Sequence, residues 1–210
     1  AGMIWNRLLG INAHVTIRKP YSARIEDYAP VVKTVEAHGD VLAAAPYIET
    51  EGFILRRPAG SEDVIRSPML VRGADAEGLI RASELSSYLW AGEVDLAPRE
   101  VEGRRADGIV IGRVLADKLA AVLGSEVHLA ILPKEMMVGG MPRMRRYVVT
   151  GIYSSGYYEF DSALAFISLG AAQCDLGWGD EVSGVRVRLR DPFEANRVSQ
   201  ELREVLRQVY

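Results

Sequence analysis

The first quarter of the chain changes its hydrophobic pattern twice. Residues 12–19 carry apolar side chains at every second position, which is typical of a half-buried strand. A helical spacing of apolar residues follows over 27–39 and ends at a glycine. Residues 41–57 then favour a long extended segment, bent or placed at a sheet edge by Pro46. This order predicts a first β-α-β unit.

The last part of the chain repeats a strand-then-helix pattern. Residues 181–190 alternate valine or leucine with arginine, so one face of a strand is predicted to be buried and the other wet. Asp191 is the expected N-cap of the next helix, and Glu194 would complete a capping-box-like pair. With a strand predicted at 163–169, this is a second α/β half. The apolar stripe predicted for its helix comprises Val198, Leu202, Val205, Leu206 and Val209.

The middle of the chain differs in composition and in its pattern of apolar residues. Residues 73–106 are rich in Gly, Glu, Arg and Ala and contain only short apolar clusters. A short strand is predicted at 108–112, a helix at 113–124 and a further strand at 126–132. The simplest interpretation is an α+β fold in which a smaller subdomain is inserted into an α/β subdomain built of β-α-β halves.

One segment, "PKEMMVGGMPRMRR" at 133–146, holds four of the six methionines of the chain. It lies between the strand at 126–132 and a strand predicted at 145–153. If these strands pair, their connection of about twelve residues is much longer than an ordinary hairpin loop. Prolines at 133 and 142 stiffen its two arms, so the segment is predicted to form a projecting hook.

Methionine side chains adapt to irregular apolar surfaces, and here they lie beside lysine and arginine. The segment could therefore be an apolar tip on a basic base that binds a partner. The alternative is that the methionines fold back and fill the core of the inserted subdomain. The pattern by itself leaves both interpretations open.

Composition narrows the class of protein. With 49% hydrophobic and 25% charged residues the chain is expected to be globular, and its formal charge of -3 argues against a nucleic-acid partner. Cys174 is the only cysteine, so no internal disulfide is expected. The three histidines, His14, His38 and His128, are far apart in sequence, and no metal site is predicted from them.

No sequence motif points to catalysis. The chain has no phosphate-binding P-loop, no zinc-protease HExxH and no Gly-x-Ser-x-Gly elbow. Glu159 and Asp161 alternate and could share one strand face, but no histidine or lysine accompanies them, so solvated charge is the preferred interpretation. We therefore predict neither an enzyme nor a cofactor. The first ten residues have the spacing of a helix face without a cap, which suggests the end of a longer helix.

An ordered set of segments resembles a known family. These segments are "WNRLLGINAHVTI", "VLAAAPYIETEGFIL", "PMLVRGAD", "GIVIGRVLADKLAAVLG", "MPRMRRYVVTGIYSSGYYEFDSALAFISL" and "VSGVRVRL". Over nearly the whole chain they are similar to the periplasmic domain of Lol-type permeases, LolC and LolE, within the wider MacB-like periplasmic core family. One departure is that "LAAVLG" is followed directly by "SEVHL", without the short turn usual in the family.

This resemblance implies a periplasmic domain between the first two membrane helices of an inner-membrane ABC permease of a Gram-negative bacterium. Residues 1–11 would be the end of the first membrane-helix extension. Residues 12–72 and 147–210 would form the porter-like subdomain, and 73–146 the inserted sabre-like subdomain with its β-hairpin hook. ATP hydrolysis would belong to a separate cytoplasmic subunit. The chain could be of the LolC type, the LolE type or a hybrid that keeps the hook.

The resemblance also implies partners. In the LolC-like branch the hook binds the periplasmic lipoprotein chaperone, LolA; other expected partners are a second permease subunit or copy, the ATPase subunit and the lipoprotein cargo. The alternative is a mechanotransmission domain like those of MacB or FtsX, with contacts through the sabre surface around Leu85–Trp90. The residues expected to bind the chaperone are Met136, Met137, Val138, Met141, Pro142, Arg143, Met144, Arg145 and Arg146.

Overall fold

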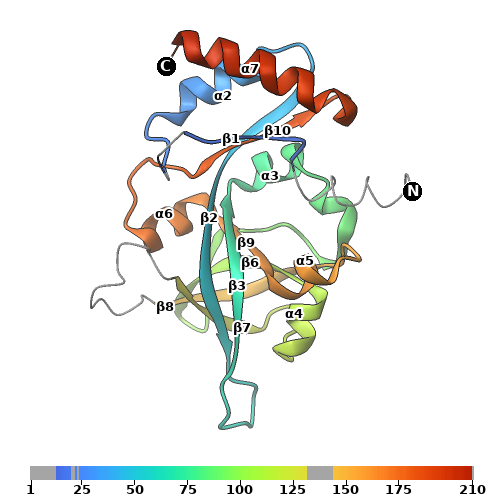
Figure 1. Cartoon of the computed structure of the whole chain (residues 1–210). Helices are drawn as coiled ribbons and strands as arrows, with labels where there is room; N and C mark the ends of the chain where they lie inside the picture. The colour runs from blue at the N-terminus through green and yellow to red at the C-terminus, as the bar shows by residue number, and fades with distance from the viewer. Residues whose placement is uncertain (1–12, 20–21, 23, 132–143, 210) are drawn as a thin grey trace. The chain divides into compact units, whose positions relative to one another are not determined.

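The computed structural model describes residues 13–19, 22, 24–131 and 144–209 (Figure 1). They form two compact units. Unit 1 falls within Ala1–Tyr47, Glu77–Leu85 and Asp180–Tyr210, and unit 2 within Ile48–Ala76 and Ser86–Gly179. The predicted helix end at 1–11 and residues 133–143 of the predicted hook lie outside the described residues. The mixture of helices and strands expected of the predicted α+β fold is confirmed.

Unit 1 is a small antiparallel sheet covered by two helices. Its strand order is β1-β10-β2, where β1 is Val15–Ile17, β10 is Gly184–Leu189, and β2 is Val41–Arg56, of which the first part belongs here. Helices α2 (Tyr28–Glu36) and α7 (Ala195–Val209) lie on the same side of this sheet (Figure 1). The first β-α-β unit predicted from the sequence is confirmed. Buried side chains of the sheet and helices include Val31, Val35, Val185, Val187, Val198 and Leu202.

The other face of the unit 1 sheet carries the arginines of β10. Arg186 and Arg188 lie opposite Ala45 and Ala43 of β2, and Ala82 of helix α3 (Ala76–Ala82) packs against these two alanines. Arg188 Nη2 donates to Glu84 Oε1 at 2.9 Å. The predicted alternation of this strand is confirmed, and its polar face is built of ion pairs as well as solvated groups.

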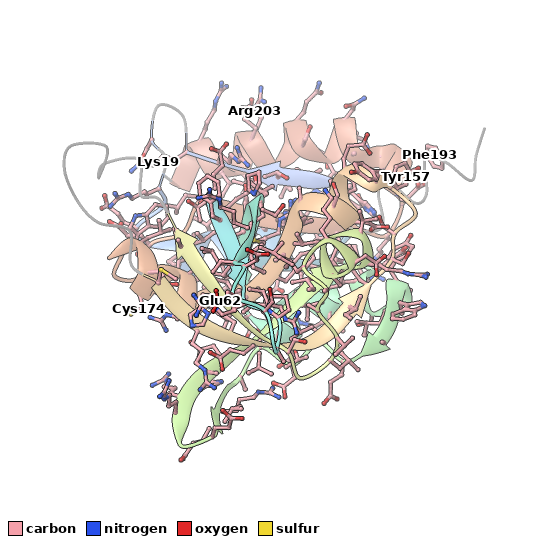
Figure 2. The ribbon with its side chains drawn as sticks, turned by 90° about the horizontal axis from the view of Figure 1, so that it is seen from below. Lys19, Glu62, Tyr157, Cys174, Phe193 and Arg203 are labelled. Atoms are coloured by element: carbon pink, nitrogen blue, oxygen red, sulfur yellow. The ribbon has the colours of Figure 1, made fainter. Side chains whose placement is uncertain are left out.

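Helix α7 begins as predicted but differs in two details. Asp191 Oδ1 accepts from Phe193 N at 2.9 Å, ahead of a 3-10 turn at Pro192–Glu194. The Glu194 carboxylate, however, accepts from Arg197 Nε at 2.7 Å, which replaces the predicted capping box. Val205 is 41% exposed, so the predicted stripe was wrong at that position. Figure 2 shows Arg203 on the solvent side of this helix.

Unit 2 contains a ring of six strands. The rest of β2 is followed around the ring by β3 (Ile65–Ala74), β9 (Leu164–Ser168), β6 (Arg104–Gly112), β8 (Met144–Tyr153) and β7 (Glu126–Ile131). The ring closes because β7 pairs with β8 on one side and returns to β2 on the other, with Gly52–Leu55 opposite Ile131–His128. Side chains buried on these strands include Ile54, Val71, Ile109, Leu129, Tyr147 and Phe166.

Shorter elements attach to this ring. Strand β4 (Leu89–Gly92) pairs with the second half of β8, and β5 (Pro98–Val101) pairs with the first half of β6. Their connections include the 3-10 turn η1 (Leu85–Tyr88) and helices α4 (Arg113–Lys118), α5 (Tyr158–Ala163) and α6 (Leu169–Leu176). The predicted strands at 108–112, 126–132, 145–153 and 163–169 are all present, as β6, β7, β8 and β9.

Two predictions about unit 2 were wrong in detail. The helix expected at 113–124 ends at Lys118, since Ala120 adopts a φ of 50° and Arg56 Nη1 donates to the carbonyl oxygens of Leu119 and Ala120. Glu159 and Asp161 lie on helix α5 and share no strand face. Asp161 is buried and accepts from Ser155 N at 2.8 Å, so it holds the turn before the helix.

The expected porter-like and sabre-like subdomains have boundaries at 72/73 and 146/147. The chain passes from one compact unit to the other at different places, namely 47/48, 76/77, 85/86 and 179/180. Strand β2 runs through one of these changes without a break. The subdomain assignment concerns the architecture of a family and stays a prediction.

Candidate partner-binding site

The structure describes three of the nine predicted site residues. Met144, Arg145 and Arg146 open strand β8, whereas the other six lie outside the described residues; these are Met136, Met137, Val138, Met141, Pro142 and Arg143. Met144 faces Ala130 in the last pair of the β7–β8 ladder, and it is 58% exposed. The two strands therefore stay paired up to the point where the methionine-rich segment leaves and returns.

Arg145 is bound by two carboxylates, and one of these also binds Tyr147; we call these four residues the Arg145 cluster. Its Nε donates to Asp175 Oδ1 at 2.6 Å, and its Nη1 donates to Asp107 Oδ2 at 3.0 Å. The Tyr147 hydroxyl donates to Asp175 Oδ2 at 3.1 Å. The side chains of Asp107 and Asp175 are only 5% and 4% exposed. Two buried carboxylates thus share one guanidinium.

Burial and charge move the ionisation of this cluster. Desolvation raises the pKa of Asp175 above its usual range, although the Arg145 charge opposes this shift. Burial likewise raises the pKa of the Tyr147 hydroxyl, and the negative charge of the neighbouring Asp175 raises it further, to a smaller extent. Burial alone would lower the pKa of Arg145, but Asp107 and Asp175 together raise it. Arg145 is therefore held in its charged form, and its charge is paired with the carboxylates of Asp107 and Asp175 in the same chain.

Arg146 is also bound within unit 2. Its guanidinium pairs with Glu126 of β7, and its Nη1 donates to the carbonyl oxygens of Val101 at 2.9 Å and Arg104 at 3.2 Å. The hydrogen bond from Arg146 lowers the pKa of Glu126. Arg146 thus ties the start of β8 to the β5–β6 turn and to β7.

These contacts concern the prediction that arginines form a positively charged surface beneath an apolar tip. Arg145 and Arg146 bind three carboxylates of the same chain, namely those of Asp107, Asp175 and Glu126. That Arg145 and Arg146 bind a partner stays a prediction. These ion pairs could not be predicted from the sequence, because the acidic residues lie at distant positions along the chain.

A second exposed surface lies on unit 2 around the residues considered for the alternative function. Leu85 is fully buried and Tyr88 half-buried, but Trp90 is 57% exposed, with Arg113 Cζ 4.7 Å from its ring centroid. On the same helix α4, Lys118 Nζ lies 5.2 Å from the ring centroid of Tyr158, which is also exposed. The sequence pointed to the surface around Leu85–Trp90 and to a helix starting at 113, but not to the contacts of that helix with Trp90 and Tyr158.

One group of side chains in unit 1 has the composition of a metal site. Among the residues that the structure describes, His38, Asp40 and Glu201 bring one ligand atom each to within 4.8 Å of one another. Arg197 already donates to Asp40 Oδ2 and Glu201 Oε1, each at 2.8 Å, and its hydrogen bonds lower the pKa of both carboxyl groups. Two of the three groups are therefore already bound to a guanidinium, and these bonds link α7 to Asp40.

Comparisons with known proteins agree with the fold. The model of the MacB-like periplasmic core domain family matches residues 6–205. The periplasmic region of MacB from Actinobacillus actinomycetemcomitans superposes with a TM-score of 0.53 at 12% identity, covering 86% of this chain and 72% of that one. The extracellular domain of the transporter YknZ from Gram-positive bacteria gives 0.52 at 14% identity, covering 90% and 85%. At these identities the two structures show the fold alone.

Closer relatives in sequence are lipoprotein-releasing system transmembrane proteins LolC. The protein from Xylella fastidiosa (strain Temecula1 / ATCC 700964) is 31% identical over 201 residues, which is 95% of this chain and 45% of the relative. The protein from Neisseria meningitidis serogroup B is 28% identical over 177 residues, which is 80% and 38%. The chain thus spans less than half the length of these relatives.

None of the helices in the described part of the chain is both long and apolar enough to cross a bilayer. The family match nevertheless extends over almost all of both units. The chain belongs to the family of MacB-like periplasmic core domains, and within that family it is of the LolC/LolE type.

Proposed function

We propose that this chain is the periplasmic domain of an inner-membrane ABC permease that releases lipoproteins, and that it docks a periplasmic chaperone of the LolA type. The observation that carries the proposal is the β7–β8 ladder, which stays paired up to Ala130 and Met144 on either side of the methionine-rich segment. The names of the LolC relatives supply the class of system. The segment at 133–146 would be the hook that binds the chaperone.

The chemistry of the segment fits such a partner. A carrier of acylated proteins needs an apolar cavity, and flexible methionine side chains can adapt to its irregular wall. The exposed Met144 shows that at least one methionine of the segment is not used to fill the core of unit 2. The paired strands β7 and β8 would hold the two ends of the segment together, so less conformational entropy would be lost on binding.

The rest of the proposal follows the family architecture. The chain would consist of a porter-like and a sabre-like subdomain, without catalytic or cofactor-binding residues. A separate cytoplasmic subunit would hydrolyse ATP, and a second permease subunit or copy would complete the transporter. The lipoprotein cargo would pass from the membrane to the chaperone at the hook.

Met137→Asp is expected to weaken binding of a LolA-type chaperone by at least about 30-fold, because a charge would enter an apolar contact. Met141→Asp should act in the same direction. Calorimetric titration of the purified domain with the purified chaperone measures the affinity. The matched control is Val64→Asp, since Val64 is also an exposed apolar residue of unit 2. Unchanged affinity in both methionine variants, with the fold intact, would refute the proposal.

A second candidate function is mechanotransmission to an efflux partner or a cell-wall hydrolase, and the exposed Trp90 favours it. Aromatic residues beside arginine are enriched at protein interfaces. Photocrosslinkers at positions 137 and 90 in cells separate the two functions. A chaperone adduct from position 137 is expected for lipoprotein release, whereas adducts confined to position 90 would support mechanotransmission.

A further inference from the structure

An exposed apolar patch of unit 2 lies beside the short helix α4 (Figure 1). Large side chains reach it from β4, from α5 and from the turn after α4. Each has between 44% and 65% of its surface exposed, and they are Trp90, Val122, Leu123 and Tyr158. Leu123 covers Gly92 of β4, since its Cδ2 lies 2.7 Å from the point where a Cβ would stand on that glycine. Trp90 is only two positions before Gly92, so Trp90 and Leu123 lie close together.

Helix α4 adds two opposite charges to this patch. Arg113 and Asp117 are exposed and four positions apart, so they project from the same side of the helix. Neither forms an ion pair with any residue in the described part of the chain. Arg113 lies on the ring of Trp90 instead, with its Cζ 4.7 Å from the ring centroid. In α7, by contrast, Arg197 and Glu201 have the same spacing and do pair. Both charges on α4 are therefore available to another molecule.

The order of these charges is self-complementary. If two copies of α4 meet antiparallel across a twofold axis, Arg113 of each copy lies opposite Asp117 of the other, and two ion pairs form together. Lys118, the next residue, lies against the ring of Tyr158 on α5 and stays outside these pairs. The apolar side chains beside the helix would lose contact with water, which favours association. Exposed aromatic rings beside arginine are also typical of protein interfaces.

We propose that the α4 surface binds the same surface of a second copy of this chain. This surface consists of Trp90, Arg113, Asp117, Val122 and Leu123. The contact goes beyond the proposed chaperone docking and does not depend on it. It also differs from the second candidate function, in which a different protein would contact Trp90. Because the surface is small, the separate chain should associate weakly, with a Kd on the order of 100 µM.

Sedimentation equilibrium of the purified chain, at concentrations on either side of this Kd, measures the association. A monomer–dimer equilibrium is expected. Trp90→Ala should weaken it about tenfold, because an exposed aromatic ring in the middle of a contact contributes strongly to binding. A chain that stays monomeric at every concentration would overturn the proposal, and the surface would then serve a different protein.

Charge reversal tests the pairing itself. Arg113→Asp leaves two acidic groups on the α4 surface, and Asp117→Arg leaves two basic ones. Each variant alone should associate at least about tenfold more weakly than the parent, because like charges would face each other across the twofold axis. An equimolar mixture of the two variants should associate again, since every acidic group then meets a basic one. No recovery in the mixture would mean that the two α4 helices do not pair in this way.

The matched control is Glu62→Arg, which reverses an exposed acidic charge in the β2–β3 loop of unit 2 (Figure 2). Its Kd should equal that of the parent. If the parent dimerises and neither reversal on α4 changes the Kd, the copies meet through another surface and the proposal is wrong. No chaperone is present in these measurements, so their failure leaves the docking function untouched, and failure of the Met137→Asp test leaves this proposal untouched.

Discussion

Replacing Arg145 with methionine is expected to lower the free energy of unfolding by about 3–5 kcal/mol at pH 7, as for a buried ion pair that loses one partner. Asp107 and Asp175 would be left buried with two negative charges and no guanidinium between them. Chemical denaturation of the purified domain measures the change. Arg105→Met is the control; because Arg105 is exposed and 3.8 Å from Asp107, its loss should cost at most about 0.5 kcal/mol.

The loss should depend on pH in a defined direction. Without Arg145 the pKa of Asp175 rises further above that of the unfolded chain, since burial already raises it and the Arg145 charge no longer opposes the shift. A folded-state pKa above the unfolded one destabilises the fold at higher pH and ceases to do so as the pH falls toward the unfolded value. The stability gap between variant and parent should therefore narrow between pH 7 and pH 4.

A rescue experiment separates charge from shape in this prediction. The triple variant that adds Asp107→Asn and Asp175→Asn to Arg145→Met should recover most of the lost stability at pH 7, because no unpaired charge remains buried. The pH dependence that Arg145→Met adds should be absent from the triple variant in the same range. A triple variant as unstable as Arg145→Met would mean that packing of the guanidinium, and not its charge, explains the loss.

Gly112→Ala is expected to cost about 3 kcal/mol, since it would force a methyl group into a filled site. Gly112 precedes helix α4 with φ -71° and ψ 152°, which alanine adopts easily, so backbone strain is not the reason. An added Cβ would overlap the backbone of Asp161, lying 2.6 Å from its Cα and touching its carbonyl oxygen. Backbone atoms of a packed helix cannot move aside cheaply.

Gly170→Ala is the matched control for this substitution. Gly170 lies in helix α6, and a Cβ added there meets no atom within 4 Å. Alanine should stabilise the helix by about 0.5–1 kcal/mol, because it loses less conformational freedom on folding. Thermal unfolding should therefore shift in opposite directions for the two variants. Equal shifts would contradict the close approach of α5 to Gly112.

Local patterns predicted the strands well, and they failed where the decisive partner is distant in sequence. The alternation in β10 has a period of two, which only a strand with one buried face satisfies. The closure of the ring depends on β2 residues 52–55 meeting β7 residues 128–131, and no local pattern encodes that contact. The helix predicted at 113–124 is longer than the observed α4 for a physical reason as well. Its apolar spacing continues through Val122 and Leu123, but both side chains are exposed in a turn.

The candidate site was predictable to a similar extent. The methionines, the prolines and the flanking strands are visible in the sequence, and the strands pair as expected. The arginines after the methionines looked like a free basic surface because their neighbours in sequence are not acidic. Their carboxylate partners lie 38 and 30 positions away for Arg145 and 20 for Arg146. Only the folded chain could reveal that these charges are already matched.

The closed ring of unit 2 also affects how the domain avoids association with other chains. A sheet that closes on itself leaves few unpaired backbone groups along its strands, and such groups are the template on which aggregation by edge pairing begins. Among the described strands of unit 2, the attached β4 and β5 each pair with one neighbour. Both are four residues long, and β4 carries a register shift between Leu89 and Ala91. Short, irregular edges of this kind are poor templates, so unit 2 offers other chains little strand edge on which to pair.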